Sequence, residues 1–139
     1  MNRNRAFRLG SAEAGHLQEL VVAQDFGRLL RHKLDGLFPK PADRKRASDL
    51  LAGFAGGDLE SARVRLAILR LAGADFAKIA ETVRGALEDG EDIVGWAERP
   101  AERHAAMSGR KLSPSELSKI REQDKQQFEH WLTEYEIVA

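Results

Sequence analysis

The sequence predicts an all-α protein, a compact bundle of about five to six helices that ends in a long C-terminal helix. Ala and Leu dominate the 139 residues, whereas aromatic residues make up only 6%, a mixture that favours helix over sheet. Glycine–acid pairs recur with about 15 residues between them, which is roughly four helical turns. A content of 42% hydrophobic and 32% charged residues is typical of a globular protein. We therefore expect residues 1–139 to form a single helical domain, with a flexible basic stretch over 1–11.

The first part of the chain predicts two helices separated by prolines. Residues 16–38 read as a long helix with an interrupted apolar stripe, and Pro39 and Pro41 should end it, because proline breaks a helix. The next helix is expected over 44–55, with Asp43 as its N-cap.

Three segments of the type Gly-x-Asp-apolar predict the boundaries of the central helices. They begin at Gly56, Gly73 and Gly90. A glycine just past a helix readily adopts the left-handed conformation, and an aspartate two residues later can cap the next helix. The expected caps are Asp58, Asp75 and Asp92. The helix over 58–72 is apolar almost all round in its second half, so we expect it at the centre of the bundle. The helix over 75–89 has a single apolar stripe.

Four acidic residues crowd positions 88–92, and we interpret them as helix ends. Glu88 and Asp89 should close one helix, and Asp92 should begin the next, which Pro100 should stop by Arg99. A calcium-binding loop needs glycine at position 6 and glutamate at position 12. Counting from Asp89, these positions hold valine and proline. We expect no metal site and no cofactor.

The last helix is expected over 114–138. Ser113 and Glu116 form a capping box, and proline follows the serine. The middle, residues 121–127, is entirely polar, whereas apolar side chains gather at the end of the helix. These are Phe128, Trp131, Leu132 and Tyr135. At about 37 Å the helix should overhang the bundle, so we predict that this exposed patch is a homodimer interface or binds another protein. The alternative is packing against Leu17, Leu20 and Val21 of the same chain.

The remaining residues offer little chemistry. There is no cysteine and no nucleophile, phosphate-loop or zinc-binding motif. His104, with Glu98 and Glu102 nearby in the sequence, would be the starting point of a small enzyme. We expect instead a non-enzymatic, self-associating protein that acts by protein–protein interaction, as a regulatory or assembly accessory.

An uneven charge distribution leaves a second hypothesis open. Residues 1–46 hold 10 Lys and Arg against 5 Asp and Glu, whereas residues 47–139 hold 12 against 17. The cluster Arg44, Lys45 and Arg46 could bind an anion, so nucleic-acid association through the basic front is the alternative function. The start of the chain lacks the apolar region of a secretory signal, and no apolar run is long enough to span a membrane. We expect a cytoplasmic protein.

Two segments resemble a group of short bacterial helical proteins of unknown function. Residues 63–79 read RVRLAILRLAGADFAKI, which is similar to the helix and glycine–acid turn of that group. The group has an ending of the type D-[IV]-[VL]-x-W-A-E-x-P. Here that ending is Asp92, Ile93, Val94, Trp96, Ala97, Glu98 and Pro100. The resemblance covers about residues 58–100. It implies a small helical bacterial cytosolic protein and implies no activity.

Overall fold

The computed structural model describes residues 26–55 and 59–134, and all regular structure in these ranges is helical. The helices are residues 26–37, α2 (Pro41–Leu51), α3 (Leu59–Ala72), α4 (Phe76–Glu88), α5 (Gly90–Glu98), α6 (Pro100–Met107) and α7 (Pro114–Leu132). The all-α prediction is confirmed. The described ranges contain seven helices, because a short helix follows Pro100. In these ranges, no helix is both long enough and apolar enough to cross a lipid bilayer.

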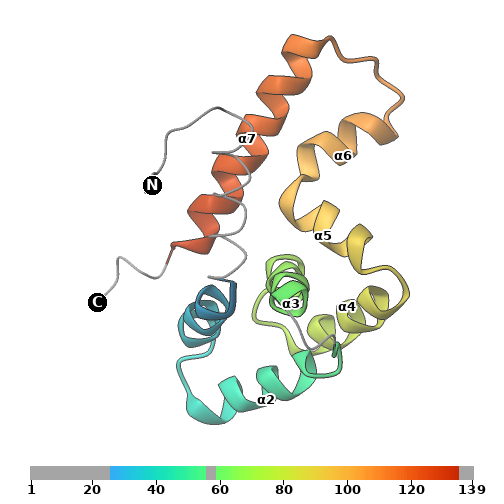
Figure 1. The fold of residues 1–139 in the computed structure, drawn as a ribbon. Coiled ribbons are helices and arrows are strands. Elements are labelled where there is room, and N and C mark those ends of the chain that lie inside the picture. Colours follow the sequence, from blue (N-terminus) through green and yellow to red (C-terminus); the bar gives the residue numbers. More distant parts are fainter. Residues whose placement is uncertain (1–25, 56–58, 135–139) are drawn as a thin grey trace, which may run out of the picture.

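Helix α3 lies at the centre of the fold, as its apolar circumference predicts. Figure 1 shows the other helices arranged around it. Residues 66–69 are at most 1% exposed, so they contact protein on every side. Around α3 there are two hydrophobic clusters. The larger joins residues of the first helix to α2, α3, α4 and α5, and the smaller joins the first helix and α3 to the end of α7.

The prolines after the first helix act as predicted, but the next helix begins earlier than expected. The first helix ends at residue 37, and Pro41 is the first residue of α2. Lys40 is the N-cap and makes no capping bond with its side chain. The prediction that Asp43 caps this helix is therefore wrong, because proline suits the first helical position and moves the start upstream. Asp43 lies in the first turn, and α2 ends at Leu51 rather than at 55.

The Gly-x-Asp-apolar pattern predicts the cap of α4 correctly but not the cap of α5. Gly73 has φ of 66°, and the Asp75 carboxylate accepts a bond from Lys78 N–H at 3.1 Å, as predicted. At the next boundary the predicted cap is wrong. Asp89, not Asp92, accepts the capping bond, and Gly90 is already helical. Only one residue separates α4 from α5, so Asp89 ends one helix and caps the next. Gly56 and Asp58 lie outside the described residues.

Pro100 ends α5, as predicted. It is also the first residue of α6, a helix that was not predicted from the sequence. Arg99 serves as the C-cap of α5 and as the N-cap of α6, without a side-chain capping bond. The first N–H groups of α6 are satisfied from another helix. Ala101 N–H and Glu102 N–H each donate to the buried carboxylate of Asp124 in α7, at 3.0 Å. The polar middle of α7 thus contacts α6 through Asp124, whereas the other six residues of 121–127 are exposed.

Helix α7 begins as predicted and ends early. Both bonds of the capping box between Ser113 and Glu116 are present, with proline at the first helical position. The helix ends at Leu132, whereas the sequence suggested 138. Glu134 N–H donates to the carbonyl oxygen of Trp131 in a turn, which tightens the chain where α7 stops. Residues 135–139 lie outside the described part.

Candidate functional site

The end of α7 and the end of α3 line an open surface groove of about 420 Å³. Its lining residues are Arg70, Gln123, Gln126, Gln127, His130, Trp131 and Glu134. Arg70 comes from α3, and the others come from α7 and the turn that follows it. This groove is the candidate site, because it combines an aromatic ring, a cation, an anion and several amides in one concave surface.

The predicted interface residues at the end of α7 divide between the core and this groove. Phe128 and Leu132 are 9% and 7% exposed, and they pack with Phe26, Leu29 and Leu66 in the smaller hydrophobic cluster. The expectation that these two form an exposed patch is wrong, because α3 and the first helix of the same chain cover them. Within the described residues, the first helix covers this end of α7 through Phe26 and Leu29.

Two predicted residues remain. Trp131 is half-buried and stacks on Phe128, with 5.8 Å between the ring centroids. It also lines the groove and packs against both hydrophobic clusters. Tyr135, like Leu17, Leu20 and Val21, lies outside the described residues, so the homodimer interface stays a prediction.

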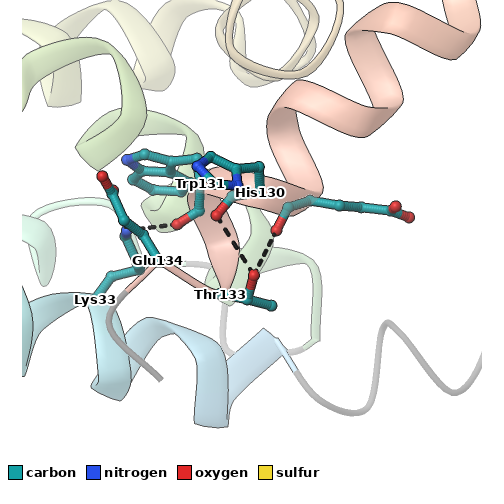
Figure 2. A network of polar contacts seen from close by, with 6 residues as sticks. Lys33, His130, Trp131, Thr133 and Glu134 are labelled. Carbon is teal, nitrogen blue, oxygen red and sulfur yellow. Dashed lines mark hydrogen bonds and ion pairs between the residues drawn. The ribbon is translucent and has the colours of Figure 1, made fainter. Parts of the chain in front are cut away.

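A buried lysine holds Trp131 in place. Lys33, in the first helix, has no exposed surface, and its Nζ donates to the carbonyl oxygen of Trp131 at 2.5 Å. The same ammonium lies 3.4 Å from Glu134 Oε1 and 4.2 Å from the centroid of the indole ring (Figure 2). Burial lowers the pKa of Lys33, and the hydrogen bond to Glu134 opposes that shift. Three contacts therefore fix the end of α7 against the first helix.

A second cation lies near the same ring. The guanidinium carbon of Arg70 is 5.6 Å from the centroid of Trp131. Burial lowers the pKa of Arg70, and the charge of Glu134 acts in the opposite direction. A cation near an indole ring contributes about 0.5–1 kcal/mol at exposed sites and more where it is desolvated. The half-buried Arg70 is therefore held close to the ring but keeps a surface toward the groove.

The wall of the groove is a polar face of α7. Gln123, Gln126, Gln127 and His130 follow the spacing i, i+3, i+4, i+7, which places them on one side of the helix, and all four are exposed. Gln126 Nε2 donates to Glu122 at 3.0 Å. In the described part of the chain, the side-chain amides of Gln123 and Gln127 have no hydrogen-bond partner. These amides can donate to and accept from another molecule.

The predicted anion-binding cluster is engaged within the chain. Arg44 donates to the backbone carbonyl oxygens that follow the first helix, at 3.2 and 3.1 Å. Lys45 pairs with Asp49 one turn later at 3.0 Å, and Arg46 lies 4.2 Å from the centroid of the Phe76 ring. These three cations therefore have structural contacts of their own, and they do not converge on a common point.

The residues of the enzyme hypothesis are divided among separate contacts. Glu98 accepts two hydrogen bonds from Arg63, at 2.9 and 2.7 Å, and Glu102 pairs with Arg121 at 3.1 Å. His104 lies edge-on to Trp96, with 5.0 Å between the ring centroids.

The two carboxylates are thus held in place by ion pairs with two different arginines. Among the described residues, no group of three or more His, Cys, Asp and Glu side chains is placed to hold a metal ion.

Lys33, the groove position of Arg70 and the amide face were not predicted from the sequence. A signal existed for the lysine. Lys33 lies four residues after Leu29 and four before Leu37, in phase with an apolar stripe, where a charged side chain needs a partner. The amide face was visible only as part of a polar run, because helical spacing alone does not show what lies opposite.

No protein-family model, curated protein or solved structure matches this chain. The resemblance of residues 58–100 to short bacterial helical proteins stays a prediction, and the geometry of the groove carries the functional proposal.

Proposed function

We propose that the protein is a non-enzymatic, helical protein-binding module, a regulatory or assembly accessory, that holds a partner polypeptide in the groove between α3 and α7. The observation that carries this proposal is the composition of the groove: a half-buried tryptophan and an arginine beside exposed amides. Tryptophan and arginine are enriched at protein interfaces and at their energetic centres. Side-chain amides suit a polypeptide, because they both donate and accept hydrogen bonds.

Rigidity supports the same proposal. Trp131 is fixed by the stacked Phe128, by Lys33 and by the smaller hydrophobic cluster. A binding surface that is already ordered loses less conformational entropy when the partner arrives. The anchor side chain of this groove is therefore in place before binding.

Nucleic-acid association is supported less well by the geometry. Arg44, Lys45 and Arg46 have partners within the chain, and a cluster that binds phosphates needs its charges on one accessible face. A cytoplasmic location belongs to our proposal as well, because the sequence contains no cysteine for disulfides.

Site-specific crosslinking in the source cells tests the proposed function. A photoreactive amino acid replaces Gln126 in the groove, and in a control chain it replaces Glu81, which is exposed on α4. We expect adducts heavier than the 15.5 kDa chain from the groove position alone. Adducts that are absent, or that are the same at both positions, would overturn the proposal.

A further inference from the structure

We infer that the partner held in the groove is a second copy of this chain, related to the first by a two-fold axis that passes through the groove. This inference rests on the proposed function, and it names the partner of the same site. A two-fold interface joins the same surface of both copies, so the surface must complement itself. The groove meets that condition in its charges and in its hydrogen-bonding groups.

The charges complement themselves because one cation and one anion line the groove. Arg70 stands on α3, and Glu134 stands just past the end of α7. In one copy, Glu134 is paired with Lys33, and Arg70 has no ion pair within the described part of the chain. An axis that passes between Arg70 and Glu134 brings the Arg70 guanidinium of each copy to the Glu134 carboxylate of the other. Two reciprocal ion pairs then form, and neither copy presents like charges to the other at these positions.

The remaining groups of the groove fit a copy of themselves equally well. The amides of Gln123 and Gln127 each offer two N–H donors and a carbonyl acceptor, so they can pair with identical amides. Trp131 near the axis gives both copies an aromatic surface that pairing removes from water. A partner of strong single-sign charge would leave either Arg70 or Glu134 facing its own sign. The near-neutral groove therefore favours a second copy over a strongly acidic or basic partner.

Reversing the two charges one at a time tests the pairing directly. Sedimentation of the full chain over about 1 to 100 µM measures the dissociation constant of the dimer. Arg70→Glu and Glu134→Arg should each raise it by roughly tenfold or more, since each homodimer would then carry two like-charge contacts. An equimolar mixture of the two variants should restore dimers, because both cross-pairs become attractive again. Circular dichroism verifies that each variant keeps its helix content.

Matched variants separate the groove from general charge effects. Lys78→Glu and Glu81→Arg likewise reverse one positive and one negative charge, but on the exposed surface of α4. They should leave the dissociation constant of the dimer unchanged. If the Arg70 or Glu134 variants lose helix content, Gln126→Glu with Gln127→Glu adds charge to the groove without touching the core. That pair should also disfavour the dimer. The same two charges placed at exposed Ser115 and Ser118, near the start of α7, should not.

The outcomes distinguish this inference from the proposed function. Dimers that dissociate in the single variants and reform in the mixture support it. A chain that stays monomeric over the whole range, while the groove crosslinks to another protein, overturns the second-copy inference and leaves the proposed function standing. A dimer that all groove variants leave unchanged overturns the inference as well, since another surface then joins the copies. Absence of any groove adduct overturns both proposals.

Discussion

Replacing Asp124 by alanine should destabilise the fold far more than its place in a polar stretch suggests. The carboxylate is 1% exposed and accepts hydrogen bonds from the N–H groups of Ala101 and Glu102, both at 3.0 Å. These are among the first N–H groups of α6, which have no partner within their own helix. Arg99, the local N-cap, makes no side-chain capping bond. Asp124 therefore caps a helix that lies more than twenty residues earlier in the chain.

The magnitude follows from the number of bonds lost. A hydrogen bond to a charged group contributes about 1.5–3 kcal/mol net, and loss of an N-cap costs about 0.5–2 kcal/mol. Asp124→Ala removes both bonds and leaves two N–H groups facing an apolar methyl, so we expect a loss of about 2–4 kcal/mol in the free energy of unfolding. Asp124→Asn keeps one acceptor oxygen and should lose roughly half as much.

Urea unfolding followed by circular dichroism measures these losses, with an unchanged dependence on denaturant as the sign of two-state behaviour. Hydrogen exchange at the amides of Ala101 and Glu102 should accelerate in Asp124→Ala. Lys125→Ala is the matched control, since Lys125 is the next residue of α7 and is exposed, and it should change stability by less than about 0.5 kcal/mol. If Asp124→Ala matched this control and left exchange at both amides unaltered, Asp124 would not act as the cap of α6.

Three further predictions concern caps and ion pairs. Asp89→Ala should cost about 0.5–2 kcal/mol in urea unfolding as the N-cap of α5, whereas Asp92→Ala should cost less than about 1 kcal/mol, because it removes only a partly exposed ion pair. Arg63→Ala should lower the free energy of unfolding by about 1–3 kcal/mol, because it leaves the 13%-exposed carboxylate of Glu98 without its two bonds. Arg63→Lys should lower it by less. The capping-box bonds lower the pKa of Glu116 below its ordinary 4.5. Their contribution to the free energy of unfolding is therefore full above pH 4.5 and is lost as the pH falls through the folded-state pKa. In this pH range, the stability of Glu116→Gln should depend less on pH than that of the unchanged protein.

The features predicted correctly from the sequence depend on neighbours in the chain. The capping box at Ser113, the cap Asp75 and the left-handed Gly73 follow from residues within one turn. The central position of α3 follows from its apolar circumference, because a helix that is apolar all round has no face to turn to water. Such signals remain readable without knowing what the helix contacts.

The helix boundaries and caps were predicted wrongly where the local sequence fits two different structures. A proline disfavours helix in the residue before it and also suits the first position of a new helix, so Pro100 ends α5 and starts α6. The acids at 88–92 offered more than one cap, and the short connection between α4 and α5 selected Asp89 over Asp92. Local propensity cannot decide between such neighbours, because the choice depends on how tightly the two helices are joined.

The groove could not have been assembled from the sequence, because its residues meet only in three dimensions. Arg70 stands near the end of α3, and the aromatic ring beside it, that of Trp131, comes from a helix 61 positions later. The apolar end of α7 was recognised as requiring cover, but a periodic pattern does not state which chain supplies it. The first helix and α3 supply it for Phe128 and Leu132.

Among the described residues, the two most deeply buried charged side chains are placed by the same principle. Asp124 lies four residues before Phe128 and eight before Leu132, and Lys33 lies four after Leu29, so each stands in an otherwise apolar stripe. The aspartate meets the N–H groups at the start of α6, and the lysine meets a carbonyl oxygen at the end of α7. Each charge is of the sign that the corresponding helix end attracts. In this chain, a charged residue in phase with an apolar stripe therefore contacts the end of another helix in both cases, the negative one at a start and the positive one at an end.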